Sequence, residues 1–371
     1  MQWRALMTNS GELTGQILTP GGLVSGRILW RDGHVERIEK AHGVPDAYVL
    51  PGFVDLHCHG GGGADVMDGG DAVRRVAATH VATGTTSFLA TTMTAPVPDI
   101  EMALAAAEAV RKAPALGEAT VLGVHLEGPF ISPQRLGAQP ANAIVGSVEL
   151  MRRFLDLAAI RVVTVATEAD RDGAFIRYLV EAGIRAQLGH SLADYETAVE
   201  AIRCGCRSVT HLFNAMSPLQ HRAPGIVGAA LAHLDYAELI PDLLHVHPGA
   251  IRAAMRAIPN VYAVTDATPA TGMPDGAYKL GSQSVFKCDN GVRLADGTLA
   301  GSCLTMSQAF RNLVSIGLTV EEASRRTSTF AADYIGETQR GRLVPGAVAD
   351  MVVVETDLSL AGVFVGGDTI S

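Results

Sequence analysis

The amino-acid sequence predicts an α/β protein, a (β/α)8 TIM barrel with a small β-sandwich domain formed by both chain ends. Strand-like segments alternate with alanine-rich amphipathic segments through the middle of the chain, as in a barrel. Short strand-like runs separated by turn residues recur at both ends. The 371 residues, 48% of them hydrophobic, suffice for one barrel plus a small domain. We therefore expect a terminal domain of residues 1–47 and 341–371, and a barrel of residues 48–340.

The terminal domain is predicted from short segments at the two ends. Residues 15–18, 22–30 and 34–39 have strand character, and turn residues such as Asp32-Gly33 separate them. Residues 349–355 and 360–365 have the same character near the other end. We expect these segments to join in one β-sandwich beside the barrel.

The barrel is predicted from eight candidate strands and the helices between them. The strands are expected at residues 48–59, 86–92, 120–128, 161–168, 185–191, 208–216, 237–246 and 261–268. The helices are expected at residues 72–83, 100–112, 148–158, 174–182, 194–204 and 248–257. An open doubly wound sheet is the alternative, but no Gly-x-Gly-x-x-Gly follows an early strand and opens a helix.

The charge and cysteine content of the chain argue against several kinds of binding partner and site. The formal net charge is −9 and no Lys/Arg cluster stands out, which disfavours binding to nucleic acid or to an anionic membrane. The cysteines number five, an odd count without a Cys-x-x-Cys pair, so we expect neither a disulfide framework nor a structural zinc knuckle. No signal-peptide pattern and no apolar run of membrane-spanning length is found, so we expect a cytoplasmic protein.

The first predicted barrel strand ends in His57-Cys58-His59, followed by four glycines. Side chains alternate between the faces of a strand, so His57 and His59 point the same way and could grip one metal ion. The glycines allow backbone and substrate to approach closely. Two histidines at a polar strand end, without a metal, are the alternative for this stretch alone.

Further polar residues follow the other predicted strands, at the end where barrel enzymes have their active sites. They are His125, Glu127, His190, His211, Asn214, His245, His247 and Asp266. Any one of them could be a hydrogen-bonded structural residue, but their placement on one rim indicates a site. Histidines with a carboxylate suit zinc or another first-row divalent ion. Between His125 and Glu127 we favour the carboxylate as ligand, because its charge partly neutralises the ion.

A metal site with an acid at its edge predicts hydrolysis. A bound divalent ion polarises a carbonyl and lowers the pKa of water to about 7. Asp266 is placed to take the proton of that water and return it to a leaving nitrogen. A serine triad would need a Gly-x-Ser-x-Gly elbow, and glycosidase chemistry would need two close acids without a histidine cluster.

Seven motifs, in order and spread over nearly the whole chain, resemble the amidohydrolase superfamily and, within it, the N-acetylglucosamine-6-phosphate deacetylases. His-Leu-Glu-Gly-Pro-Phe at 125–130 and His-Leu-Phe-Asn-Ala-Met at 211–216 are specific to these deacetylases. The others lie at residues 51–60, 189–191, 244–246, 265–267 and 301–306. The first of these contains the His-x-His that is common to the whole superfamily.

The resemblance implies a metal centre. The principal divalent ion would be zinc, with iron, manganese or cobalt as alternatives, and its ligands would be Glu127, His190 and His211. His57 and His59 would hold a second ion, which some members have and others lack. Asp266 would be the general base and acid and would also touch the metal.

The resemblance also implies a substrate site and a homodimer. Backbone amides near Asn214 and Ala215 would cradle the sugar phosphate, and His245 would contact it. Arg222 would reach the phosphate bound by the neighbouring subunit. The reaction would convert N-acetyl-D-glucosamine 6-phosphate to D-glucosamine 6-phosphate and acetate, in amino-sugar catabolism or cell-wall recycling.

The sequence departs from these deacetylases in two places. Residues 241–243 read Pro-Asp-Leu where the family has Ala-Asp-Gly. Gln139 stands where the family has a histidine that contacts the acetamide oxygen, so we predict Gln139 as a catalytic and substrate-binding donor. A mobile surface loop around Gln139 is the alternative. A related N-acetylated sugar phosphate, another amide substrate, or an inactive sugar-phosphate-binding homologue remain alternative functions.

Overall fold

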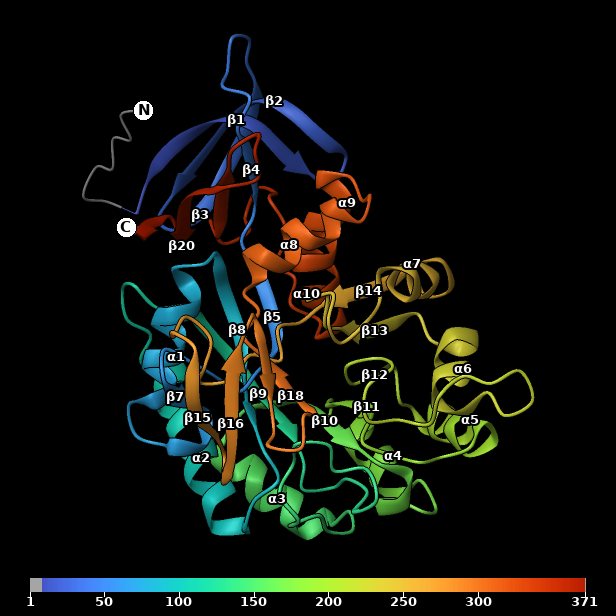
Figure 1. Ribbon diagram of the computed structural model, residues 1–371. Coiled ribbons are helices and arrows are strands. Elements are labelled where there is room, and N and C mark those ends of the chain that lie inside the picture. Colours follow the sequence, from blue (N-terminus) through green and yellow to red (C-terminus); the bar gives the residue numbers. More distant parts are fainter. Residues whose placement is uncertain (1–8, 371) are drawn as a thin grey trace.

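A computed structural model of the chain describes residues 9–370. Residues 1–8 and 371, which the predicted terminal domain includes, lie outside this described part. The described chain has a mixed α/β fold, with one sheet built from both ends and a second, curled sheet in the middle (Figure 1).

Seven strands from the two ends of the chain form one sheet in the order β21-β20-β19-β4-β1-β2-β3. They are β1 (Gly11–Thr19), β2 (Gly22–Arg31), β3 (His34–Lys40), β4 (Tyr48–Pro51), β19 (Met351–Val354), β20 (Leu360–Val365) and β21 (Asp368–Ile370). The sheet curls until the start of β3 meets the segment before β19, where Val35 N donates to Ala347 O at 2.8 Å. Its inner face has an apolar core of its own, which includes Ile17, Ile28 and Met351. The predicted sandwich strands therefore share one continuous sheet.

The middle of the chain contains a curled parallel sheet in the order β12-β11-β10-β9-β8-β5. Its strands are β5 (Phe53–Cys58), β8 (Thr85–Thr92), β9 (Thr120–Glu127), β10 (Ile160–Val165), β11 (Arg185–Leu188) and β12 (Ser208–Val209). A separate parallel pair follows, β13 (Tyr236–Leu239) and β14 (Asn260–Ala263). Every residue of β5 and β8 is buried, as in parallel strands covered on both faces.

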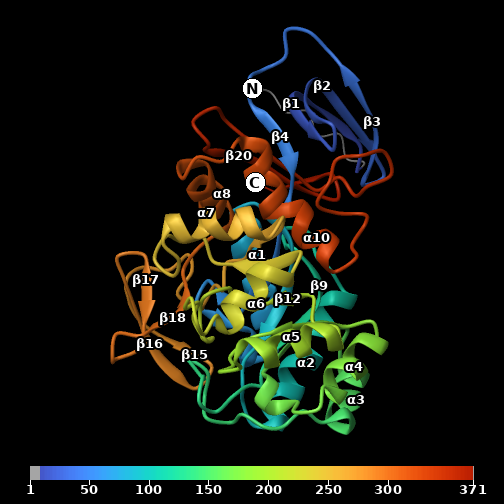
Figure 2. The ribbon, with the colours of Figure 1, turned by 90° about the vertical axis from the view of Figure 1, so that its right-hand side faces the viewer.

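The helices cover the outside of the curled sheet (Figures 1 and 2). Those that the sequence predicted begin and end within three residues of the expected positions: α1 (Ala72–Val81), α2 (Val97–Lys112), α3 (Val148–Leu157), α4 (Ala174–Glu181), α5 (Tyr195–Cys204) and α7 (Pro248–Ala257). Side-chain caps fix two of these starts, since Ser147 accepts from Leu150 N and Asp194 accepts from Thr197 N.

Other helices were not predicted: α6 (Gly225–His233), α8 (Met306–Ser315), α9 (Val320–Ser324), a π-helical turn (Arg325–Thr329), α10 (Phe330–Tyr334) and the 3-10 turns Val66–Asp68 and Thr167–Ala169. The helix α6 lacks the alternation of apolar and polar faces that reveals a surface helix, because its first six residues are all buried.

Several predicted strands need correction. The predicted strand 48–59 is two strands, β4 in the terminal sheet and β5 in the curled sheet, separated by Gly52. A Cβ atom at Gly52 would lie 2.2 Å from Thr86 Oγ1, so the crossing from one sheet to the other requires glycine. The predicted strands 185–191, 208–216, 237–246 and 261–268 are shorter, because β11, β12, β13 and β14 end before the polar residues.

A four-stranded antiparallel sheet between β14 and α8 was also not predicted. It comprises β15 (Gly276–Leu280), β16 (Gln283–Cys288), β17 (Gly291–Arg293) and β18 (Leu299–Ser302). It projects to one side of the curled sheet (Figure 2). The turn after β15 contacts the hairpin of β6 (Gly60–Gly61) and β7 (Ala64–Asp65), since Gly281 N donates to Asp65 Oδ2 at 2.7 Å. Its end residues Leu280 and Leu299 line the main pocket described below.

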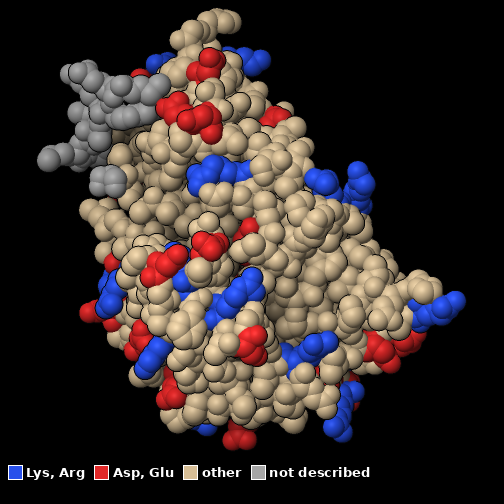
Figure 3. Space-filling model, viewed as in Figure 1, with Lys and Arg blue, Asp and Glu red and all other residues tan. Residues whose placement is uncertain are grey.

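Two further properties bear on partners. None of the helices in residues 9–370 is long and apolar enough to cross a membrane. On the face shown in Figure 3, positive and negative side chains are interspersed, without a large continuous area of either sign.

Candidate metal centre and substrate pocket

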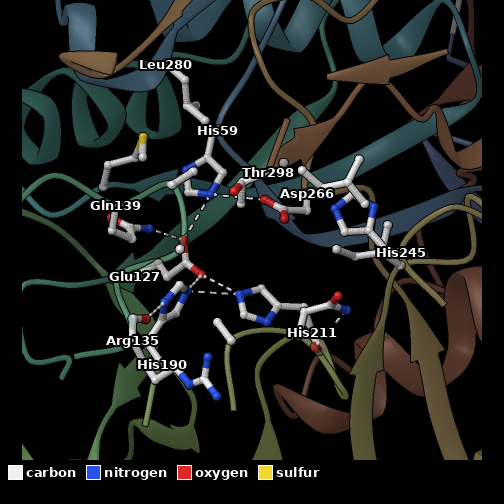
Figure 4. A pocket seen from close by; sticks show the side chains of 18 residues that line it. His59, Glu127, Arg135, Gln139, His190, His211, His245, Asp266, Leu280 and Thr298 are labelled. Atoms are coloured by element: carbon white, nitrogen blue, oxygen red, sulfur yellow. Dashed lines mark hydrogen bonds and ion pairs between the residues drawn. The ribbon is translucent and has the colours of Figure 1, made fainter. Parts of the chain in front are cut away.

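A cavity of about 300 Å³ opens where the strands of the curled sheet end. Figure 4 shows the side chains that converge in it from segments far apart in the sequence. The polar ones include His59, Glu127, Gln139, His190, His211, His245 and Asp266. The structure thus brings together residues that the sequence placed on one predicted rim.

Glu127, the last residue of β9, lies at the centre of the cluster. Its Oε1 atom is 3.1 Å from His190 Nε2 and 3.1 Å from His211 Nε2. The two Nε2 atoms are themselves 3.1 Å apart. All three side chains are buried, so these atoms form a compact triangle facing the pocket.

The other oxygen of Glu127 faces a second group. Its Oε2 atom is 3.1 Å from His59 Nε2 and 3.4 Å from His57 Nε2. Asp266 completes this group, with Oδ1 3.3 Å from His59 Nε2 and 3.5 Å from His57 Nε2. Glu127 therefore joins two potential ligand groups, one through each carboxylate oxygen.

The two groups fit first-row divalent ions. Nitrogen and oxygen atoms bound to one tetrahedral zinc at about 2.0–2.1 Å lie about 3.4 Å from each other, close to the separations found here. Two of the four histidines use their remote nitrogen elsewhere, since His57 Nδ1 is 3.1 Å from Glu238 Oε2 and His190 Nδ1 donates to Arg135 O at 2.8 Å, whereas Nδ1 of His59 and of His211 is buried without a partner among the described residues. All four histidines direct Nε2 to Glu127, and the contacts at Nδ1 of His57 and His190 orient those two rings as in histidine ligands of metals.

The charges of the cluster also favour a bound cation. Burial raises the pKa of Glu127, but the neighbouring His57 and hydrogen bonds from His190 and His211 outweigh it and hold the pKa well below the usual value. The pKa of Asp266 is lowered to about 2, because His57 and His59 outweigh its burial. Against the effect of burial, hydrogen bonds to Asp266 and Glu127 raise the pKa of His59 to about 9, so the two carboxylates attract positive charge to the cluster. A divalent cation would supply that charge in place of protons on the histidines.

At three of the proposed metal and catalytic residues the backbone is strained in the same way. His190, His211 and Asp266 have φ angles of 48°, 31° and 50°, a region that residues with a Cβ rarely adopt. Each lies just after its strand ends, where the chain turns and aims the side chain back over the sheet. Such strain persists only where the surroundings enforce it, and it is concentrated at functional sites.

Asp55 helps to hold the backbone next to Asp266 in this conformation. Its carboxylate accepts hydrogen bonds from Thr265 Oγ1 at 2.5 Å, from Thr265 N at 3.2 Å and from His57 N at 3.2 Å. Asp266 N in turn donates to His57 O at 2.9 Å. The residue before Asp266 is thereby fastened to the strand that carries His57 and His59.

Gln139 lies inside the site rather than on a surface loop. Its side chain is only 4% exposed, which excludes the alternative of a mobile surface position. Its Nε2 atom donates to Glu127 Oε2 at 2.6 Å, and its Oε1 atom accepts from Thr94 N at 2.7 Å. Gln139 therefore orients Glu127 in this structure, and its action on an acetamide oxygen stays a prediction.

The substrate-side residues fall into two groups. His245, Asn214 and Ala215 line the pocket, and Asp242 fixes His245 through a 2.6 Å contact between Oδ2 and Nδ1. The unusual Pro-Asp-Leu sequence at 241–243 thus leaves His245 facing the pocket. Arg222 is exposed and does not line the pocket of its own chain.

Two residues near the cluster have supporting positions. His125 uses both nitrogens, on Leu56 O at 3.0 Å and on Thr164 Oγ1 at 2.8 Å, and burial together with His57 lowers its pKa to about 4. Glu238, fully buried in β13, was missed at the sequence level. A glutamate within an otherwise apolar strand was the available signal.

Comparison with known proteins gives consistent results. The sequence model of the amidohydrolase family matches residues 48–370. The N-acetylglucosamine-6-phosphate deacetylase of Lysinibacillus sphaericus is 39% identical over 90% of each chain. The N-acetylgalactosamine-6-phosphate deacetylase of Escherichia coli O157:H7 is 35% identical, over 99% of this chain and 98% of that one.

A solved structure is similar over nearly its full length. It is a mutant N-acetyl-D-glucosamine-6-phosphate deacetylase from Mycobacterium smegmatis in complex with N-acetyl-D-glucosamine 6-phosphate. The TM-score is 0.90 at 33% identity, covering 97% of this chain and 99% of that chain.

Proposed function

The chain belongs to the amidohydrolase family, and we infer that it hydrolyses the acetamide of N-acetyl-D-glucosamine 6-phosphate to D-glucosamine 6-phosphate and acetate. The observation that carries this inference is the position of Glu127, whose two oxygens face two histidine groups beside the buried, ionised Asp266. Relatives that span most of the chain carry the name of this activity, and one similar structure contains this substrate.

For the metal, we propose that Glu127, His190 and His211 hold the principal ion, and that His57 and His59, together with Asp266, hold a second. Zinc suits this set of nitrogen and oxygen ligands, with iron, manganese or cobalt as alternatives. A divalent ion in such a site polarises the carbonyl and lowers the pKa of water to about 7.

Asp266 moves the protons in this proposal. Its low pKa makes it an ionised acceptor at neutral pH, and it lies at the edge of the pocket. It accepts a proton from the water that attacks the carbonyl carbon. When the C–N bond breaks, Asp266 returns that proton to the sugar nitrogen, which leaves as an amine.

The remaining polar side chains bind the sugar phosphate. We propose that backbone amides near Asn214 and Ala215 cradle the phosphate, that His245 contacts it, and that Gln139 acts near the acetamide oxygen. The bond from Asp242 raises the pKa of His245 against the effect of burial, which favours the charged form that an anion would attract.

Arg222 supports a homodimer. It lies between Gln220 and Ala223, which pair as an isolated bridge across a turn, and its side chain is exposed. From there it serves the phosphate site of a second copy rather than its own. The cysteines, all five of them free, fit a reducing cytoplasm, where the reaction would serve amino-sugar catabolism or cell-wall recycling.

We also propose that the curled sheet and the β13–β14 pair close into an eight-stranded barrel. Leu212 N donates to Glu238 O at 2.9 Å next to β12, and Asp266 N donates to His57 O at 2.9 Å between β14 and β5. These two bonds span the gaps on either side of the pair. The terminal sheet would then be the small domain beside the barrel, with boundaries near residues 47 and 341.

Acetate release from three sugars tests the function. The metal-loaded protein is incubated with N-acetylglucosamine 6-phosphate, N-acetylgalactosamine 6-phosphate and unphosphorylated N-acetylglucosamine, and acetate and free amine are measured together. We expect equal amounts of both products, with the highest kcat/KM for the first sugar. A higher value for the galactosamine sugar would favour the activity named for the Escherichia coli relative. Tight binding without acetate would indicate an inactive sugar-phosphate-binding homologue.

A further inference from the structure

Arg135 is the one lysine or arginine among the residues that line the pocket in the described chain. It lies in the loop that follows β9 and Glu127. In Figure 4 it lies on the side of His190, away from Leu280 at the other edge of the pocket.

The backbone that carries Arg135 is fixed to the metal centre. Arg135 O accepts the 2.8 Å hydrogen bond from His190 Nδ1, and Arg135 N donates to Ser132 O at 3.0 Å. At the far end of the loop, Gln139 is bound to Glu127. The guanidinium is therefore presented to the pocket from a held loop, in a defined position relative to the proposed ligands.

The guanidinium of Arg135 lacks a partner among the described residues of the chain. Within residues 9–370 it takes part in none of the ion pairs or side-chain hydrogen bonds, and its Nε atom is buried without an acceptor. Comparable arginines are paired, such as Arg74 with Glu118 at 2.9 Å and Arg326 with Glu322 at 2.5 Å. A buried, unmatched N–H group costs free energy unless a ligand supplies the acceptor.

The chemistry of that ligand follows from the donor and its neighbours. The N–H groups of arginine form a planar fork that matches the oxygens of a phosphate. The same loop passes close to the proposed phosphate cradle, since a Cβ atom on Gly137 would lie 3.6 Å from His190 Cε1 and 3.9 Å from Ala215 Cβ. We propose that Arg135 binds the substrate phosphate within the chain that cleaves the amide, an inference that rests on the proposed function.

This assignment gives the pocket a phosphate ligand from its own chain, in addition to Arg222 from a second copy. It also explains how an acidic protein with carboxylates at the pocket floor selects a dianionic substrate. The specific consequence is that Arg135 sets the preference for phosphorylated over unphosphorylated sugar.

That preference is measurable as the ratio of kcat/KM for N-acetylglucosamine 6-phosphate to kcat/KM for N-acetylglucosamine. Arg135→Ala should lower this ratio by about 10–100-fold, as expected for a lost charge-assisted hydrogen bond. Arg135→Lys should recover part of it, because the charge remains and the fork is lost. Arg256→Ala, at an exposed position on α7, is the control and should leave the ratio unchanged.

An unchanged ratio in Arg135→Ala would overturn the proposal, even if both rates fell together, because that pattern indicates a role in loop position only. A binding measurement separates this outcome from failure of the proposed function. Calorimetry compares the affinities of parent and Arg135→Ala protein for glucosamine 6-phosphate and for glucosamine, which requires no turnover. Arg135→Ala should weaken binding of the phosphorylated amine about tenfold or more. Equal affinities of the two proteins for it would refute the assignment, whether or not acetate is released.

Discussion

Replacing Gln139 by alanine should weaken metal binding and also destabilise the fold, and the two effects can be measured separately. The change removes the 2.6 Å hydrogen bond that orients Glu127. It also removes the acceptor that lies 2.7 Å from Thr94 N, so this buried N–H group loses its partner. A hydrogen bond to a charged group contributes about 1.5–3 kcal/mol, and about 1.4 kcal/mol corresponds to tenfold in affinity. Metal affinity should therefore fall about 10–100-fold, the range found when the partners of metal ligands are removed.

The orphaned Thr94 N–H group should lower the free energy of unfolding of the metal-free protein by about 1–3 kcal/mol. The first quantity is measured by competition with a chelator of known affinity, and the second by urea unfolding. Gln134→Ala is the matched control, because Gln134 lies on the same loop but is exposed. Metal affinity and stability both equal to those of the control would refute the reasoning from the Gln139 contacts.

The role of Gln139 in the chemistry needs a separate pair of variants. If its amide or the family's histidine donates to the acetamide oxygen, Gln139→His should raise kcat with the 6-phosphate substrate and Gln139→Ala should lower it. Both are measured at one pH and saturating metal. Two unchanged rates would limit Gln139 to orienting Glu127.

Four further substitutions test the site residue by residue. Glu127→Ala should abolish both metal retention and turnover, because Glu127 joins the two ligand groups; full metal content and full rate would show that the ligand assignment is wrong. The parent protein should bind more than one metal ion per chain, and His57→Ala should reduce that number to about one. If the parent and the variant both bind one ion, His57 and His59 only orient other residues. Asp266→Asn should lower kcat by about 10²–10⁴-fold while the substrate still binds, and a near-normal kcat would assign the proton transfer to another group. Arg222→Ala should raise KM for the phosphorylated substrate about tenfold or more, with little effect on the unphosphorylated sugar. An equal loss for both sugars would rule out a phosphate role. If Arg222 acts across a dimer, mixing the Arg222→Ala and Asp266→Asn proteins should restore some activity.

Most residues that converge in the pocket were predictable from the sequence, because they belong to motifs tied to the ends of strands. Their roles stay predictions. His57 and His59 share a face by the alternation of a strand, and Glu127 was favoured over His125 because a carboxylate neutralises a divalent charge. The structure places Glu127 in the cluster and gives both nitrogens of His125 other partners. These arguments need only local pattern and chemistry.

The remainder depends on contacts that no local pattern encodes. The break at Gly52 is set by Thr86 on the neighbouring strand, and the hydrogen bond of Gln139 to Glu127 closes a loop that the sequence alone leaves open. The helix α6 and the sheet β15–β18 lack the periodicity on which prediction relies. The role of Glu238 can be recognised only from its contact with His57, which requires that β13 lies beside that histidine. Conformation at His190, His211 and Asp266 is likewise imposed by tertiary packing against local preference.

The central claim is that the Glu127 cluster holds a divalent ion with which this chain deacetylates N-acetylglucosamine 6-phosphate. The most direct test removes all metal, returns zinc in measured steps, and records ions bound per chain together with the rate of acetate release at each step. We expect no acetate from the metal-free protein, and a rate that rises with occupancy of the first ion and is absent in Glu127→Ala. Full acetate release by protein with no bound metal would contradict this expectation.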